Sequence, residues 1–195
     1  INLMYLVLMA LLALNVSSDV LNGFSLVDES LNRSTANSTK QNNSLYKDMG
    51  DFLTKNPEKV KEWFNKAQHV RKMSDSLYQY ADELKLKMVK AADGDEADVM
   101  NIRNKEDLEP ANFVMLAPGT GQGKKLYNAI NNYKKSILTM VLDSSQRKMI
   151  SSNLSTAVPR RATTIGKKWE EYIYENTPVA AAVTLLTKLQ NDIRY

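Results

Sequence analysis

The sequence predicts an all-α protein, with a single N-terminal transmembrane helix that continues into an elongated periplasmic helical bundle. Two observations predict this class. No charged side chain precedes Asp19, and apolar side chains elsewhere recur at alternating spacings of three and four residues. The composition agrees, because 43% hydrophobic and 25% charged residues are typical of a packed protein.

Residues 1–21 are long enough to form the membrane helix, since about 20 residues at about 1.5 Å each span a bilayer core of about 30 Å. A cleaved signal peptide is the alternative, because the densest apolar run, residues 3–14, has the length of a signal-peptide core. Against it, the helical spacing continues past any cleavage point, and no A-x-A site is visible.

The flanking charges predict the orientation. Acidic residues come before the first basic residue, Arg33, so this flank carries no positive-inside signal. We therefore expect residues 22–195 to form a bundle domain outside the cytoplasm. The chain starts at Ile1, and no helix-ending signal precedes Tyr195, so we expect the native chain to extend in both directions.

One face of the first helix carries an unbroken series at spacings of three and four, here called the N-terminal seam. It comprises Leu6, Ala10, Ala13, Ser17, Val20, Phe24, Val27 and Leu31. Its small residues fall at membrane depth, where they allow two helices to approach closely, and its large ones fall outside, where water favours their burial. The seam predicts one continuous helix that packs against its own copy in a homodimer.

Residues 32–44 are rich in Asn, Ser and Thr, whose side chains compete with a helical backbone for hydrogen bonds. A loop and a long polar helix are both open for this segment, and we prefer the helix because apolar spacing resumes at Leu45. Asn56-Pro57-Glu58 then starts a second helix. Its regular spacing runs to Gly94 and predicts that Trp63 and Leu77 are buried. At about 54 Å, this helix implies an elongated bundle.

The segment 93–123 contains Pro and Gly and lacks periodicity, so it predicts a long irregular connection with one short helix near residues 105–113. Helical spacing returns in three later segments and in one short piece. The predicted helices cover residues 126–140, 144–156, 167–175 and 178–195. In the third, Trp169, Tyr172 and Ile173 are predicted to face inward.

No motif predicts catalysis, metal binding or a cofactor. The glycine-rich PGTGQGKK at 118–125 lacks the first Gly and the final Ser or Thr of a phosphate loop, so it predicts a flexible loop before a helix. The acidic DGDEAD at 93–98 lacks the Gly and the Glu of a calcium loop. His69 is the single histidine, there is no cysteine, and the consecutive Glu170 and Glu171 cannot face one pocket.

The net charge of +4 is scattered rather than grouped in a stripe, which argues against nucleic-acid binding. The polar membrane residues Tyr5 and Asn2 lie on a face next to the N-terminal seam. A phenol in hydrocarbon needs a protein or water partner, although an interfacial anchor is an equal alternative for Tyr5. No acid lies in mid-membrane, so any carboxylate that transfers protons must belong to a partner.

The string INLMYLVLMALLALNVSSDVLNGF resembles the transmembrane signature of the GldM/PorM family of gliding-motility and type IX secretion motor subunits, and WEEYIYENTPVAAAVTLLTKLQNDIR is similar to the end of that family's first periplasmic domain. The resemblance implies a single-pass protein of the bacterial inner membrane, with a cytoplasmic N-terminus and a mainly periplasmic chain. It also implies later domains that reach secretion-system components at the outer membrane.

The resemblance further implies a homodimer inside a ring of a GldL/PorL-like membrane protein. That ring carries the titrating glutamate and converts proton-motive force into movement, and Tyr5 matches the family tyrosine near the proton path. A sensory receptor fragment is the main rival interpretation, since it also joins a membrane helix to a periplasmic bundle. A membrane-tethered chaperone or scaffold is a further alternative.

Overall fold

The computed structural model describes residues 3–7 and 16–195, and all regular structure within these ranges is helical. Residues 3–7 are helical and precede the bundle. The bundle elements are α2 (Ser18–Lys55), α3 (Pro57–Asp93), α4 (Glu109–Ala111), the π-helix η1 (Asn112–Leu116), α5 (Gly123–Met140), α6 (Ser144–Asn153), α7 (Arg160–Thr164), α8 (Trp169–Tyr174) and α9 (Val179–Arg194). The expected all-α class is confirmed for these residues.

Within the described ranges, none of the helices combines the length and the apolar character needed to cross a membrane.

Helix α2 begins at a side-chain cap. Ser17 has an extended backbone, with φ −65° and ψ 148°, and its hydroxyl accepts a hydrogen bond from Val20 N at 3.3 Å. Asp19 in the first turn adds a favourable charge at the helix N-terminus. The expectation of one continuous helix is therefore wrong at Ser17, where capping starts a new helix. The expected division after residue 21 falls in the first turns of α2 and stays a prediction.

The polar segment 32–44 lies within the 38-residue helix α2, as preferred from the sequence. The hydroxyls of Thr35 and Thr39 donate to the carbonyl oxygens four residues earlier, each at 2.8 Å. Other polar groups of the segment face α9, where Asn42 donates to Arg194 O at 2.7 Å. These tertiary contacts satisfy side chains that would otherwise compete with the helix.

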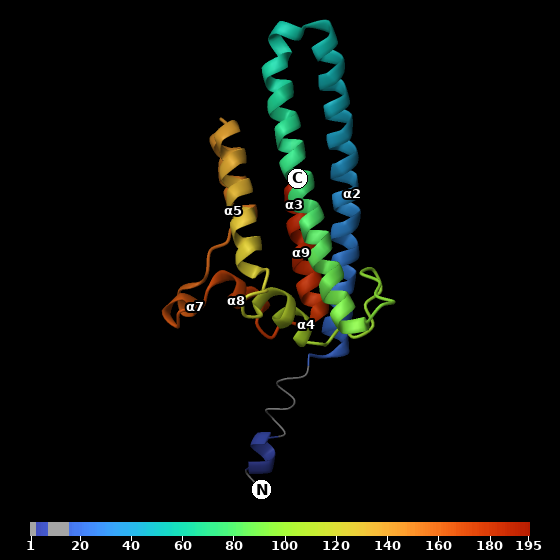
Figure 1. The fold of residues 1–195 in the computed structure, drawn as a ribbon, viewed down its shortest axis with the longest axis vertical. Coiled ribbons are helices and arrows are strands. Elements are labelled where there is room, and N and C mark those ends of the chain that lie inside the picture. The colour runs from blue at the N-terminus through green and yellow to red at the C-terminus, as the bar shows by residue number, and fades with distance from the viewer. Residues whose placement is uncertain (1–2, 8–15) are drawn as a thin grey trace.

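Helices α2 and α3 form a long antiparallel hairpin joined at Asn56, and α9 lies along the half of the hairpin farther from that turn (Figure 1). Pro57 starts α3 as expected, and Gly94 ends it with a left-handed φ of 82°. Most of the core between α3 and α9 is apolar. It includes Leu77, Ala81, Leu84, Met88, Val183, Leu186 and Ile193. Burial of Leu77 is confirmed.

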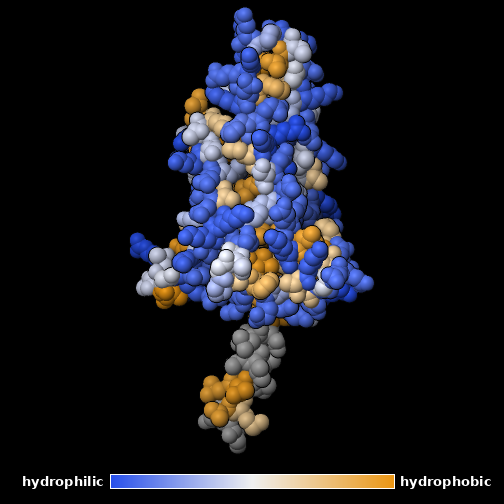
Figure 2. All heavy atoms as spheres, in the orientation of Figure 1, coloured by the Kyte–Doolittle hydropathy of each residue, from blue (hydrophilic) through white to orange (hydrophobic). Residues whose placement is uncertain are grey.

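Trp63 is 53% exposed, so its predicted place in the core is wrong. It lies in the part of the hairpin near the turn, which extends beyond α9 (Figure 1). Lys66 Nζ lies 4.7 Å from the centre of its ring, a cation–π contact at the surface. Apolar atoms appear among polar ones at this end of the molecule (Figure 2). The spacing of α3 was correct, but α9 ends at Arg194, which bonds Ser74 and Asp75, about three turns of α3 away from Trp63.

Helix α5 packs on α3, with α8 and η1 against the end where α5 begins. Leu126, Ile130 and Ile137 of α5 are buried as predicted. In α8, Trp169 and Ile173 pack against the core, but Tyr172 is 45% exposed and its predicted inward position is wrong. Tyr174 is buried instead and meets Trp169 edge-on at 6.1 Å between ring centres. A six-residue helix is too short for spacing to show its buried face.

Candidate functional site

The contacts that join α9 to the α2–α3 hairpin form the candidate site, here called the α9 clamp. Thr177-Pro178 leads into α9, whose first turn contains buried Ala180, Ala181 and Ala182. Small side chains allow close approach of neighbouring helices, so polar groups on α9 come within hydrogen-bonding distance of both helices. The clamp residues are Thr184, Gln190, Asn191 and Arg194 on α9, Thr35 and Asn42 on α2, and Ser74, Asp75, Asp82 and Lys85 on α3.

Contacts to α2 occur at three levels along the helix. The Thr184 hydroxyl lies 3.2 Å from Phe24 O, the Thr35 hydroxyl lies 3.3 Å from Asn191 Oδ1, and Asn42 Nδ2 donates to Arg194 O at 2.7 Å. The first and last levels are 18 residues apart on α2, or about 27 Å. The Asn42 bond has a defined donor and acceptor. Each threonine hydroxyl has one hydrogen, which it shares between the contact across the interface and a carbonyl oxygen four residues earlier on its own helix, at 2.8 Å. Together the three contacts favour one register between α2 and α9.

Contacts to α3 centre on a buried lysine. Lys85 Nζ donates to Gln190 Oε1 at 2.6 Å and lies 3.2 Å from Asp82 Oδ1, while its side chain is only 6% exposed. Gln190, which is fully buried, donates through Nε2 to Asp82 Oδ1 at 2.7 Å and to Tyr78 O at 3.0 Å. Every polar atom of the Gln190 side chain thus has a partner, so the network favours one register of α9 on α3.

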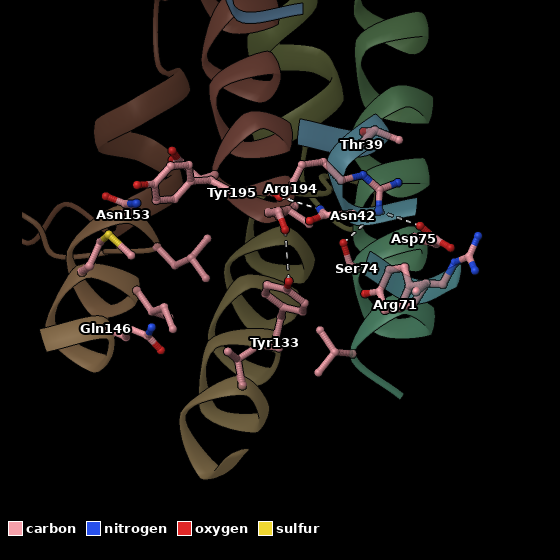
Figure 3. A pocket seen from close by; sticks show the side chains of 18 of the residues that line it. Thr39, Asn42, Arg71, Ser74, Asp75, Tyr133, Gln146, Asn153, Arg194 and Tyr195 are labelled. Carbon is pink, nitrogen blue, oxygen red and sulfur yellow. Dashed lines mark hydrogen bonds and ion pairs between the residues drawn. The ribbon is translucent and has the colours of Figure 1, made fainter. Parts of the chain in front are cut away.

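The end of α9 lies beside a cavity of about 370 Å³ between the hairpin, α5 and α6 (Figure 3). Arg194 donates to Ser74 Oγ at 3.0 Å and to Asp75 Oδ1 at 2.7 Å. Tyr133 donates to Ile193 O at 3.4 Å, and burial raises the pKa of its phenol above the usual range. Polar groups from α3 and α5 therefore hold the last turn of α9.

The two sequence motifs first considered as ligand loops are explained by packing. A Cβ on Gly123 would lie 2.5 Å from Glu170 Cβ and 2.9 Å from Met115 O, so this glycine permits close contact with α8. Asp93 accepts hydrogen bonds from the backbone of Arg103 and Asn104 and thereby anchors the loop after α3. Within the described residues, no group of three His, Cys, Asp or Glu side chains is placed to hold a metal ion.

Two of the predicted membrane-face and seam residues lie in the helical segment 3–7. Tyr5 and Leu6 are exposed there, whereas Asn2, Ala10 and Ala13 lie outside the described residues. Ser17 caps α2, so its predicted packing role stays untested.

On α2, Val20 and Val27 are half-exposed, and Phe24 and Leu31 are partly buried. These seam residues share a face next to the one that packs on α9. The contact of these seam residues with a second copy of the chain stays a prediction.

The sequence profile of the GldM N-terminal domain matches residues 19–195. The chain belongs to the GldM family. A comparison with curated protein sequences finds no match. GldM membership associates the chain with the gliding-motility and type IX secretion machinery. The GldM family is a membrane-associated structural component of that machinery and is not known for enzymes. It favours the motor interpretation over a sensory receptor fragment.

Reasoning from the GldM sequence missed the buried polar residues of the α9 clamp. The sequence does contain a pattern that indicates the α2 side of the α9 clamp. Four residues recur there every seven positions, namely Leu21, Asp28, Thr35 and Asn42. Leu21, Asp28 and Thr35 are buried. No such spacing marks Lys85 or Gln190, each of which directly follows a leucine of the apolar series. Their burial depends on a partner helix about a hundred residues away in sequence.

Proposed function

We propose that this chain is a non-enzymatic subunit of an inner-membrane motor driven by proton-motive force, which transmits movement to the periplasm and outer membrane for type IX secretion and gliding. The family match is the observation that carries this proposal. In it, residues 1–21 cross the inner membrane with the N-terminus in the cytoplasm, and the bundle lies in the periplasm.

The arrangement of α2 and α9 supports a role in transmission. Helix α2 begins at Ser18, within the last residues of the proposed membrane segment, and contacts α9 at levels from Phe24 to Asn42. Packed helices linked by specific hydrogen bonds resist sliding and rotation relative to each other, so they pass movement on as one body. Movement at the start of α2 therefore reaches the end of α9, and through it the later domains that contact secretion-system components.

The proton-dependent step involves Tyr5 and Asn2. In a homodimer packed through Leu6, Ala10 and Ala13, these polar side chains face a surrounding ring of a GldL/PorL-like protein whose glutamate titrates. The Tyr5 hydroxyl donates to an ionised carboxylate and accepts from a carboxylic acid. A contact that differs between the two protonation states couples proton transfer, worth about 2.3 kcal/mol per 100 mV, to movement.

Replacement of Tyr5 by Phe tests this role. Tyr5→Phe keeps the ring and removes the hydroxyl, so we expect the complex to assemble at wild-type level while secretion and gliding fall at least tenfold. Tyr172→Phe, at a half-exposed position on α8, is the matched control and should leave both activities unchanged. Normal gliding in a Tyr5→Phe strain with wild-type protein level would contradict the proposed role of Tyr5.

A further inference from the structure

Asp28 on α2 is a buried acid with an unpaired oxygen. The residue is 8% exposed, and its Oδ2 accepts a hydrogen bond from Asn32 Nδ2 at 2.9 Å. Oδ1 is buried and has no hydrogen-bond donor among the described residues. None of the ion pairs formed by these residues includes Asp28. Burial of a carboxylate without a cation or a full set of hydrogen-bond donors is unfavourable in free energy. A positively charged partner would therefore stabilise Asp28 in this position.

Asp28 lines a cavity of about 630 Å³ between the first turns of α2, the loop around residues 99–105 and α9. Lys105 also lines this cavity, but its ammonium donates to Asn22 Oδ1 at 3.2 Å. The apolar rim includes Leu26 and Met100, which are 68% and 65% exposed. The cavity therefore combines an acidic group beneath an apolar rim with access from the surface.

The chemistry of the lining favours an alkyl cation over a metal ion. Hard metal ions take six or more oxygen ligands, usually with several carboxylates, and no three acidic or other metal-ligating side chains converge among the described residues. Lys and Arg side chains bury an apolar stem and present a charged end. The cavity offers a counterpart for each part, since Leu26 and Met100 in its lining are apolar and Asp28 is acidic.

We propose that this cavity receives a lysine or arginine side chain of a partner polypeptide, with Asp28 as its ion-pair acceptor. The partner differs from the second copy of this chain. Ser25 and Glu29 line the cavity and lie about 140–180° around α2 from Val20 and Val27 of the N-terminal seam. This distinction from the second copy rests on the proposed dimer, whereas the basic ligand follows from Asp28 alone.

Site-specific photocrosslinking in whole cells tests the proposal with the full-length protein. A benzophenone amino acid at Met100 lies on the cavity rim, and one at Leu45 is a control on α2 away from it. We expect the Met100 probe to give one adduct whose attached peptide, read by mass spectrometry, comes from another protein and has Lys or Arg next to the attachment point. The Leu45 probe should not give this adduct.

Two substitutions on opposite sides of the contact make the test specific. Asp28→Asn removes the charge with little change of shape and should reduce the adduct at least fivefold, while Asp48→Asn, the same change at an exposed acid of α2 that does not line this cavity, should not. Replacement of the partner's basic residue by Ala should reduce the adduct by the same factor. Because this change leaves the present chain intact, it tests the contact even if the Asp28→Asn variant misfolds. An adduct with phospholipid, with a second copy or with a peptide lacking a basic residue would overturn the proposal. The proposal would also be overturned if no adduct formed, or if neither Asp28→Asn nor the partner's substitution by Ala reduced the adduct.

Discussion

The ammonium group of Lys85 on α3 lies 2.6 Å from the side-chain oxygen of Gln190 on α9, in the protein interior. Gln190→Leu keeps the approximate volume but leaves this buried cation with the partly exposed Asp82 and a distant Thr187 hydroxyl. We expect the free energy of unfolding to fall by about 2–4 kcal/mol, because a buried charge loses its best acceptor.

The matched control is Gln79→Leu, the same substitution at an exposed position of α3, which should change stability by less than about 0.5 kcal/mol. Urea unfolding followed by circular dichroism measures both variants. Equal stability of the two would show that the clamp network does not stabilise α9.

Leu77 and Trp63 lie on the same apolar series of α3 but differ in burial, at 5% and 53% exposed. Leu77→Ala leaves a cavity in the core and should cost about 2–5 kcal/mol. Trp63→Ala removes a surface side chain, so we expect a loss of about 1 kcal/mol or less. Resistance to limited proteolysis should fall for Leu77→Ala alone; equal loss in the two variants would place Trp63 in an interface that this chain does not form by itself.

The N-terminal seam predicts the contacts of the membrane dimer. Single cysteines at Ala10, Ala13 and Ser17 should form disulfide-linked dimers in membranes, in preference to cysteines at the control positions Leu8, Leu11 and Leu14. Ala13→Leu should weaken the dimer by about 1–3 kcal/mol through overpacking. Uniform crosslinking around the helix would exclude a defined seam.

Burial raises the pKa of the Tyr174 phenol well above its ordinary value of 10.0. An unfolded chain releases this proton near pH 10, whereas the folded protein holds it, so this contribution to stability is complete below pH 10 and is lost as the pH rises further. Tyrosinate absorbance should therefore show a late-titrating class that appears only with alkaline unfolding.

Tyr174→Phe should remove one tyrosine from this late-titrating class. The same late amplitude in Tyr174→Phe and wild type would assign the late class to other tyrosines, such as Tyr133.

The sequence by itself determined the helical class and most helix limits. Pro57 and Gly94 bound α3, and Pro178 precedes α9, because backbone restrictions and apolar spacing act within a few residues. The match to a known family was also readable from two strings. By contrast, the role of Tyr5 and of the seam stays a prediction, since it depends on partners.

Tertiary structure alone decided which faces are covered. Apolar spacing on α3 continues through Trp63, but α9 ends at Arg194, beside Ser74 and Asp75. The same pattern therefore gives a core residue at Leu77 and a surface residue at Trp63. Lys85 and Gln190 are buried because their hydrogen-bond partners lie on helices distant in sequence. Burial of a polar side chain is favourable only where such a partner exists, and local sequence does not specify where the partner helix will lie.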